Sequence, residues 1–336
     1  MDQIIISDIY ANKRLDLVLA QIYTEYSRSK LQELLSQGLI SLDGNSKIKG
    51  NYKLKIGNII TVDLEAIKKS KLTSETFIAE NIDLDIIYQD EDIIIINKPA
   101  NLVVHPAAGN WSGTLVNGLL YHFPELANLP RAGIVHRLDK DTTGLMVVAR
   151  NIIAHNYLIK QLQNREVTRK YMALVNGHLI TGGIVNANIA RHPHNRLKMS
   201  VVDTNKFSTK PGAVDESIEE NSKYNGKEAI THYKIIKKYP KHSLLELKLE
   251  TGRTHQIRVH MAHIGYPVVG DSLYGRAYAA PKNATSEEDV LTWRNFNRQA
   301  LCAVELGFIH PKTKEYNSWK IDIPMDMQGL LNILNK

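Results

Sequence analysis

The amino-acid sequence predicts an α+β protein in which a small amino-terminal domain precedes a large domain built on a largely antiparallel mixed sheet. Two observations lead to this prediction. Strand-like and helix-like segments do not alternate regularly, as they would in a doubly wound parallel sheet. The 336 residues, 43% of them apolar, can also bury one large core and one small core.

The small domain is predicted to span residues 13–65. Its helix-like runs are 15–19 and 31–35, its strand-like runs are Ile40–Leu42 and Ile59–Val62, and Asp43-Gly44-Asn45 is typical of a turn. Ser27 stands where the second helix would take its N-cap, with Arg28 and Lys30 just inside it. We therefore expect two helices and a small hairpin, with two basic side chains at the start of the second helix.

Two segments lack the hydrophobic periodicity of a packed element. Residues 66–82 carry clustered charge and are interpreted as a linker. Residues 203–229 combine an acidic patch with scattered Pro, Gly, Ser and Asn. We interpret them as a mobile insertion within the large domain, which is predicted to span residues 83–330.

The elements of the large domain follow from its apolar patterns. Residues 85–88 and 93–96 are predicted to form a hairpin that ends before Pro99. The expected helices are Leu115–Tyr121, Ala154–Leu162 and Thr254–His263, and the further strands are Leu145–Ala149, Lys170–Val175 and Leu244–Leu249.

The charge distribution favours an acidic partner. The formal net charge is +7, and the segment from Lys160 to Lys210 alone has nine Lys or Arg against two acids. Such a basic segment is typical of RNA or DNA binding, although a merely basic soluble protein is the alternative. The single cysteine, Cys302, excludes an internal disulfide, and no run approaches the length of a membrane span. We expect a cytoplasmic protein that is not associated with a membrane.

The run from Gly133 to Arg150, GIVHRLDKDTTGLMVVAR, is the most informative part of the chain. It sets His136, Arg137 and Asp139 before a sharp turn and a strand-like segment. A carboxylate can act as a nucleophile, and a guanidinium can fill the space that an extruded base leaves in its stack. The run thus suits chemistry on a base of a nucleic acid, while Asp139 as a simple turn cap remains the alternative.

Two further blocks follow in order, RKYMALVNG at 169–177 and LETGRTHQIRVHMAHIGYPVVGDSLYG at 249–275. Together with the Asp139 run they resemble the RluA-type pseudouridine synthases, from about Arg14 to Met325. The closest pattern within the family is its D type, which acts on large-subunit ribosomal RNA. Cys302 departs from that pattern, because a histidine is common there.

The resemblance implies a pseudouridine synthase catalytic domain and a role for each matching residue. Asp139 would be the nucleophile, Tyr171 would pack against the uracil and is a candidate for proton removal, and Arg258 would pair with Asp139 and orient it. Arg137 would assist base flipping, and Arg253 would contact a phosphate or support the structure. Uridine and pseudouridine are isomers, so the reaction needs no cofactor.

The segment 13–65 resembles the S-four-type RNA-binding fold. The matching pieces are Arg14-Leu15-Asp16, Ser27-Arg28, Gly38-Leu39-Ile40 and Lys55-Ile56-Gly57. This resemblance makes Arg28 and Lys30 candidate RNA-binding residues. A generic helical cap with solvated lysines is the alternative.

The sequence thus predicts an isomerase that makes pseudouridine in large-subunit ribosomal RNA, free or in an assembling subunit, and that works as a monomer. One alternative is a non-catalytic RNA-binding ribosome assembly factor. Another is a synthase of the same family that acts on other ribosomal or transfer RNA uridines, and a third is a hydrolase with Asp139 and Asp141 as its carboxylate pair. The histidines at 192, 194, 255, 260 and 263 lack carboxylate or thiolate partners in sequence, so no metal is expected.

Overall fold

The structure is a computed structural model that describes residues 2–23, 26, 28–63, 78–106, 111–202, 226–275 and 279–336, with only the backbone of 28–30. The chain divides into two compact units, residues 1–76 and 77–336. Among the described residues, no helix is long and apolar enough to cross a membrane.

The small unit packs two helices on a three-stranded antiparallel sheet. Its elements are β1 (Asp2–Ile5), α1 (Leu15–Ile22), α2 (Arg28–Ser36), β2 (Ile40–Leu42) and β3 (Ile59–Val62), and the strand order is β1-β3-β2. The helical spacing of Leu and Val places the apolar side chains of α1 and α2 in one buried core with Ile40, Leu54 and Ile60. The predicted turn is present, with left-handed backbone at Asp43 (φ 49°) and Gly44 (φ 79°).

Strand β1 lies outside the predicted bounds 13–65. It pairs with β3 from Asp2 opposite Val62 to Ile5 opposite Ile59. Two of its four residues are exposed and two are partly buried, and the apolar run at Ile4–Ile6 is only three residues long, too short to reveal a strand in the sequence. The predicted cap Ser27 and the side chains of Arg28 and Lys30 lie outside the described residues.

The predicted linker 66–82 extends too far toward the large unit. Residues 64–77 are outside the described chain, but 78–82 are bound to α4 (Leu115–His122). The side chain of Asn117 donates to the carbonyl of Ile78 at 2.7 Å, and the Glu80 N–H donates to the carbonyl of Asn117 at 3.0 Å. These residues therefore belong to the large unit. Of the predicted insertion, residues 203–225 are outside the described chain.

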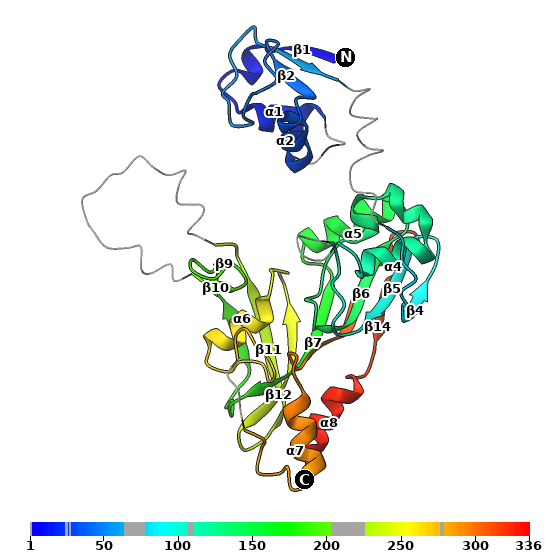
Figure 1. Ribbon diagram of the computed structural model, residues 1–336, viewed down its shortest axis with the longest axis vertical. Helices are drawn as coiled ribbons and strands as arrows, with labels where there is room; N and C mark the ends of the chain where they lie inside the picture. Colours follow the sequence, from blue (N-terminus) through cyan, green and yellow to red (C-terminus); the bar gives the residue numbers. More distant parts are fainter. Residues whose placement is uncertain are drawn as a thin grey trace, which may run out of the picture. The chain divides into compact units, whose positions relative to one another are not determined.

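The large unit is built on a nine-stranded sheet (Figure 1). Eight strands follow the order β4-β5-β6-β13-β7-β12-β11-β8, and the ninth, β14, pairs with β13. The strands are β4 (Ile86–Gln89), β5 (Ile93–Lys98), β6 (Thr143–Ala149), β7 (Thr168–Asn176), β8 (Gly183–Asn186), β11 (Ile230–Lys238), β12 (His242–Leu249), β13 (Leu301–Ile309) and β14 (Tyr316–Lys320). Every pairing is antiparallel except that of β6 with β13. The prediction of an α+β protein with a largely antiparallel mixed sheet is confirmed.

Helices cover both faces of the sheet. Alternate residues of a strand point to opposite faces, so the fully buried Ile93–Ile96 contributes to two cores. Ile94 and Ile96 belong to the larger core, which also contains residues of α4, α6 (Gln256–His263), α7 (Glu287–Asn295) and α8 (Met325–Leu334). Ile93 and Ile95 pack with α5 (Ile152–Gln163) on the other face. A small two-stranded sheet, β9 (Ile189–Arg191) with β10 (Met199–Val201), contacts α6.

The parallel contact between β6 and β13 sets the position of the loop that precedes β6. Gly144 lies opposite Ala303 with φ 112°, and a Cβ at Gly144 would stand 2.2 Å from the Ala303 carbonyl oxygen. Only glycine permits this approach. The loop 139–142 is therefore held against the middle of the sheet, where β7 is the next strand.

Candidate active site

A cleft of about 830 Å³ opens in the large unit beside the loop 139–142. Its walls come from the segment that precedes β6, from β7, and from the segment that leads into α6. Five residues singled out in the sequence line it: Arg137, Asp139, Tyr171, Arg253 and Arg258. The fold thus gathers three sequence blocks into one site.

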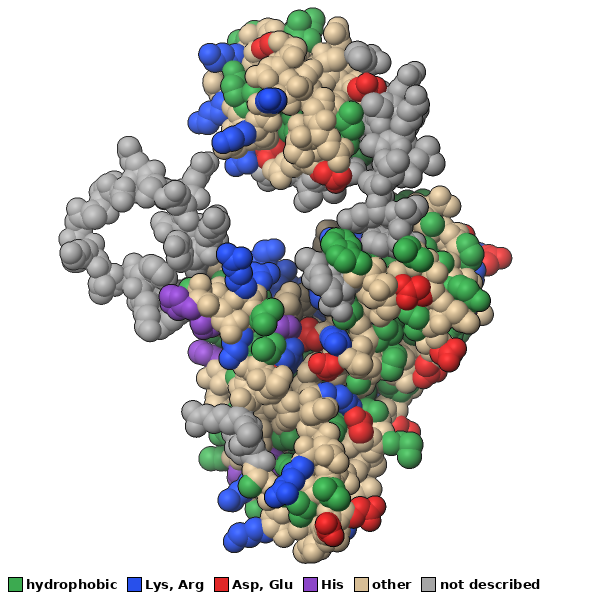
Figure 2. Space-filling view, in the orientation of Figure 1, with side chains coloured by type: hydrophobic (Ala, Val, Ile, Leu, Met, Phe, Trp, Pro, Cys, Tyr) green, Lys and Arg blue, Asp and Glu red, His purple; other side chains and the backbone are tan. Residues whose placement is uncertain are grey.

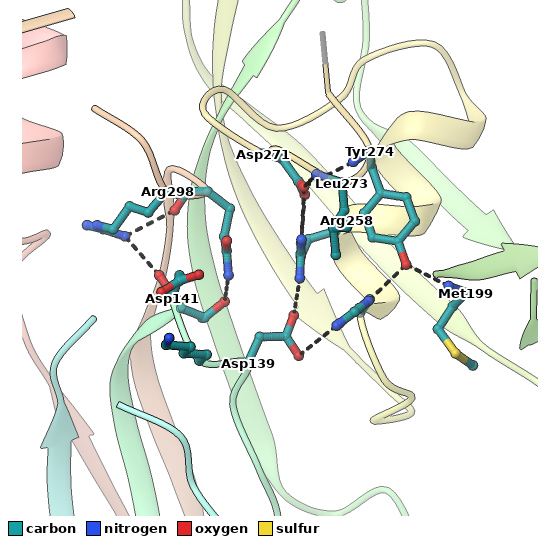
Figure 3. Close-up of polar contacts among 12 residues, drawn as sticks. Asp139, Asp141, Met199, Arg258, Asp271, Leu273, Tyr274 and Arg298 are labelled. Carbon is teal, nitrogen blue, oxygen red and sulfur yellow. Dashed lines mark hydrogen bonds and ion pairs between the residues drawn. The ribbon is translucent and has the colours of Figure 1, made fainter. Parts of the chain in front are cut away.

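Asp139 presents its carboxylate to this cleft. Its main-chain carbonyl accepts a turn hydrogen bond from Thr142 at 3.1 Å, so the turn uses the backbone and leaves the side chain available. Oδ2 accepts from Nη1 of Arg258 at 3.0 Å (Figure 3). Oδ1 lies 3.9 Å from Nε2 of His255, beyond hydrogen-bond distance. One carboxylate oxygen is therefore held and the other faces the cleft.

Arg258 is fixed by a second carboxylate. Asp271 accepts from Nε at 2.6 Å and from Nη2 at 2.9 Å, and it also accepts from the backbone N–H groups of Leu273 and Tyr274 (Figure 3). Burial would lower the pKa of Arg258, but the hydrogen bonds and charges of Asp271 and Asp139 raise it above its ordinary value. The guanidinium is a permanent cation, and its Nη1 nitrogen is left to donate to Asp139.

Buried donors fix the backbone of the loop from behind. The fully buried Lys98 donates from Nζ to the carbonyls of Pro99 (2.7 Å), Leu102 (2.9 Å) and Lys140 (2.8 Å). Burial lowers the pKa of Lys98 to about 7, against the attraction of Asp141 and Asp139. The carbonyl of Asp141 accepts from Arg298 Nη1 at 3.3 Å. The main chain on the carboxyl side of Asp139 is thus held at two successive carbonyls.

His136 attaches the start of the loop to β6. Its Nε2 accepts from the Val147 N–H at 3.0 Å. Burial and then the charge of Arg169 lower the pKa of His136 to about 3, so the ring is neutral. Arg137, the next residue, is exposed at the cleft, and no hydrogen bond or ion pair joins its guanidinium to another described residue. It is available to a ligand.

Tyr171 is buried in the centre of the sheet, where β7 pairs with β12 and β13. Burial raises the pKa of Tyr171 to about 12, and Asp139 adds to the shift while Arg169 opposes it. A phenol with so high a pKa is a poor base at neutral pH. Its position on the cleft wall favours the packing role over proton removal.

Arg253 combines a structural contact with a place on the cleft wall. Its Nε donates to the Glu228 carbonyl at 2.9 Å, and its backbone N–H donates to the Gln256 side chain. Asp141 does not line the cleft, so the structure offers no geometry for Asp139 and Asp141 as a hydrolytic pair.

One group of potential metal ligands lies elsewhere in the described chain, at Asp90, Asp92 and His310. Nδ1 of His310 accepts from the backbone of Lys312 and Thr313, so its Nε2 carries the proton that bonds Asp90 at 2.9 Å. The ring has no lone pair left for a metal. In the described ranges, the histidines at 192, 194, 255, 260 and 263 form no such group.

The family model for RNA pseudouridylate synthases matches residues 92–263, which contain all five cleft residues named above. The chain belongs to this family. The ribosomal large subunit pseudouridine synthase D of Salmonella typhimurium is 44% identical over 98% of this chain and 93% of the relative. The protein of that name in Haemophilus influenzae is 46% identical over 96% of this chain and 91% of the relative. The chain is an RNA pseudouridine synthase, and its resemblance to the D type is confirmed.

Solved pseudouridine synthase structures share the fold. Human RNA pseudouridylate synthase domain containing 1 is 26% identical, with a TM-score of 0.50 over 73% of this chain and 85% of the human chain. Human RNA pseudouridylate synthase domain containing 4 is 23% identical and shows the fold alone, with a TM-score of 0.55 over 74% and 92% of the two chains.

Sequence reasoning gave no role to several residues of this pseudouridine synthase site. They are Lys98, His255, Asp271, Tyr274 and Arg298. Lys98 had one signal, since it follows an apolar run of four isoleucines in which a lone charge requires buried acceptors. Asp271 and Tyr274 stand in the third block, but nothing in their spacing shows that they face the arginine.

Proposed function

We propose that this pseudouridine synthase converts uridines of large-subunit ribosomal RNA into pseudouridine, with Asp139 as the nucleophile. The names of the relatives support the substrate, since they are ribosomal large subunit pseudouridine synthases at 44–46% identity. The observation that carries the proposal is the state of Asp139. Arg258 engages Oδ2, and Oδ1 is open to the cleft.

In this proposal Oδ1 attacks the bound nucleoside and the C1′–N1 bond breaks. The uracil then rejoins C1′ through C5, and the bond to Oδ1 breaks, which returns its electron pair to the Asp139 carboxylate. The proton on C5 is lost, and N1 gains a proton. Atoms and electrons balance without an oxidant or reductant. Arg258 holds the nucleophile, the ring of Tyr171 packs against the uracil, and Arg137 enters the space that the extruded base leaves.

The surface around the cleft supports a polyanionic substrate. Figure 2 shows Lys, Arg and His side chains gathered over β9, β10 and α6. This surface includes Arg191, Arg196 and Lys198 on and between β9 and β10. Arg253 adds a cation on the cleft wall and is proposed to contact a phosphate.

The small unit is proposed to be an S-four-like RNA-binding domain that recruits the RNA, with Arg28 and Lys30 in contact with phosphates. Its own buried core and three-stranded sheet support an independent module. We further propose a cytoplasmic monomer that acts on the ribosomal RNA itself or on the assembling large subunit.

The test is release of tritium from large-subunit RNA labelled at C5 of uridine. The wild-type chain should release tritium, and Asp139→Asn should release none while it binds the RNA with nearly unchanged affinity. Glu287→Gln, an exposed carboxylate on α7, is the matched control and should behave as the wild type. Binding without release by the wild type would instead support an RNA-binding assembly factor.

A further inference from the structure

His255 occupies an unusual backbone position at the cleft. It precedes α6 with φ 57° and ψ 21°, a left-handed conformation that favours glycine or asparagine. Such strained residues gather at functional sites, where the surrounding structure holds them. This conformation also explains why the helix begins at Gln256, two residues after the predicted start. The His255 ring lines the cleft and is 17% exposed.

Tyr274 selects the tautomer of the His255 ring. The Tyr274 hydroxyl oxygen accepts from the Met199 backbone N–H at 2.7 Å, and it lies 2.8 Å from Nδ1 of His255. If the hydroxyl donates its hydrogen to Nδ1, the Met199 N–H, the Tyr274 hydroxyl and Nδ1 of His255 all have a partner. If Nδ1–H donated instead, the hydroxyl hydrogen would have no acceptor among the described contacts. The arrangement therefore favours a ring with its proton on Nε2.

The Nε2 proton is directed to the reacting end of Asp139. Nε2 lies 3.9 Å from Oδ1, the carboxylate oxygen that Arg258 leaves free. Burial lowers the pKa of His255, Arg258 and Arg137 lower it further, and Asp139 and Asp271 oppose the shift. The ring is thus a neutral donor. Because the gap is too long for a direct bond, a substrate atom that approaches Oδ1 comes within reach of Nε2.

We propose that His255 is a catalytic residue that donates a hydrogen bond from Nε2 to the reacting uridine beside Asp139, and that Tyr274 is the residue that positions it. This inference rests on the proposed function. When the C1′–N1 bond breaks, the electron pair stays with the uracil and spreads over its ring nitrogen and carbonyl oxygens. A fixed donor stabilises that charge, while the proton stays on His255 throughout.

The small sheet of β9 and β10, which carries Arg191 and Lys198 on and beside its strands, is hydrogen-bonded to Tyr274. Met199 is the first residue of β10, and its N–H is one of the two partners of the Tyr274 hydroxyl (Figure 3). The guanidinium of Arg258 also lies over the Tyr274 ring, 5.2 Å from its centroid. Tyr274 therefore contacts the residue that holds the nucleophile and the residue that we assign to the substrate.

Two substitutions distinguish a hydrogen-bonding role of the His255 ring from a purely structural role. His255→Asn keeps a residue that tolerates the left-handed backbone, but its side chain is too short to bring a donor to the Nε2 position. His255→Gln can place an amide N–H near that position. His263→Asn, at the exposed end of the same helix, is the matched control.

The rate is measured as single-turnover tritium release with saturating enzyme. We expect His255→Asn to be about 100-fold slower than the wild type, with the RNA dissociation constant changed less than about twofold. His255→Gln should be at least about tenfold faster than His255→Asn, and His263→Asn should match the wild type. A wild-type rate in His255→Asn would overturn the proposal.

Nuclear magnetic resonance on the full chain with ¹⁵N-labelled histidine tests the arrangement without RNA. The signal that is absent from the His255→Gln spectrum is assigned to His255. In the wild type at neutral pH this signal should show the Nε2–H tautomer, whereas in Tyr274→Phe it should show a mixture of the two tautomers. An Nδ1–H or doubly protonated ring in the wild type would contradict the proposal. Absence of tritium release by the wild type would count against the proposed function, whereas the tautomer measurement would still decide the state of His255.

Discussion

Asp271 holds Arg258 through two of the three guanidinium nitrogens, Nε and Nη2, and leaves the third, Nη1, pointing at the nucleophile. The side chain of Asp271 is fully buried, so nothing but the protein sets its geometry. The orientation of Asp139 thus depends on a carboxylate that never meets the substrate.

Asp271→Asn should therefore slow the reaction without weakening RNA binding. The amide retains the shape but gives up the charge and one acceptor, so Arg258 loses its bidentate hold. We expect a single-turnover rate about 10- to 100-fold below that of the wild type and a similar dissociation constant. Asp322→Asn, an exposed residue, serves as the control. A parallel loss of binding would indicate general unfolding, which thermal denaturation would reveal.

Lys98→Met should destabilise the large unit, because three carbonyls lose the buried ammonium that donates to them. We expect a loss of about 3 kcal/mol or more in the free energy of unfolding. Denaturant titration of the large unit, monitored at several pH values, measures it.

The same residue predicts a pH dependence. The pKa of Lys98 is lowered to about 7 in the folded chain, whereas an unfolded lysine titrates near about 10.4. Between these values the unfolded chain binds more protons, so the unfolding free energy should rise with pH across about 7 to 10. Lys98→Met should lack this contribution. Equal pH slopes in the two proteins would show that Lys98 keeps an ordinary pKa.

Gly144→Ala should prevent normal folding of the large unit. The added Cβ would lie 2.2 Å from a backbone oxygen at a φ of 112°, and neither strand can move without a shift of the sheet. We expect a loss of about 3 kcal/mol or more. Gly329→Ala in α8 is the matched control, since its Cβ would meet only Thr292 at an ordinary 3.5 Å. That change should be neutral or stabilise by about 0.5–1 kcal/mol.

Arg137→Ala should leave stability unchanged, because the exposed guanidinium has no partner among the described residues. If Arg137 supports the extruded base, the single-turnover rate should fall by about tenfold or more. The loss should shrink on an RNA whose target uridine is already unpaired, because less unstacking is then required. An equal loss on both RNAs would argue for a different role.

Residues 77–336 should fold and retain chemistry without the small unit, since each unit has its own core. The truncated chain should bind ribosomal RNA more weakly, with a shallower dependence of affinity on salt because fewer phosphates are contacted. Binding at several salt concentrations, with tritium release at saturation, measures both effects. An unchanged salt slope would contradict a recruiting role for Arg28 and Lys30.

Much of the fold is local and could be predicted. Helical spacing identified α4, α5 and the leucine faces of α1 and α2, and the runs of isoleucine and valine identified β5 and β6, because period and burial are properties of neighbouring residues. The exceptions have local reasons too. Strand β1 has no buried residue to mark it, and α6 starts late because His255 adopts a left-handed conformation.

The motif blocks of the sequence determined the family, the chemistry and the candidate nucleophile, since those depend on which residue types stand together along the chain. The tertiary structure alone decided which groups meet. Asp139 and Arg258 are 119 residues apart, and only the register of β6, β13 and β7 and the packing of α6 bring them to 3.0 Å. The contact of Asp271 with Arg258 and the contact of Tyr274 with His255 likewise depend on tertiary packing that no local pattern encodes.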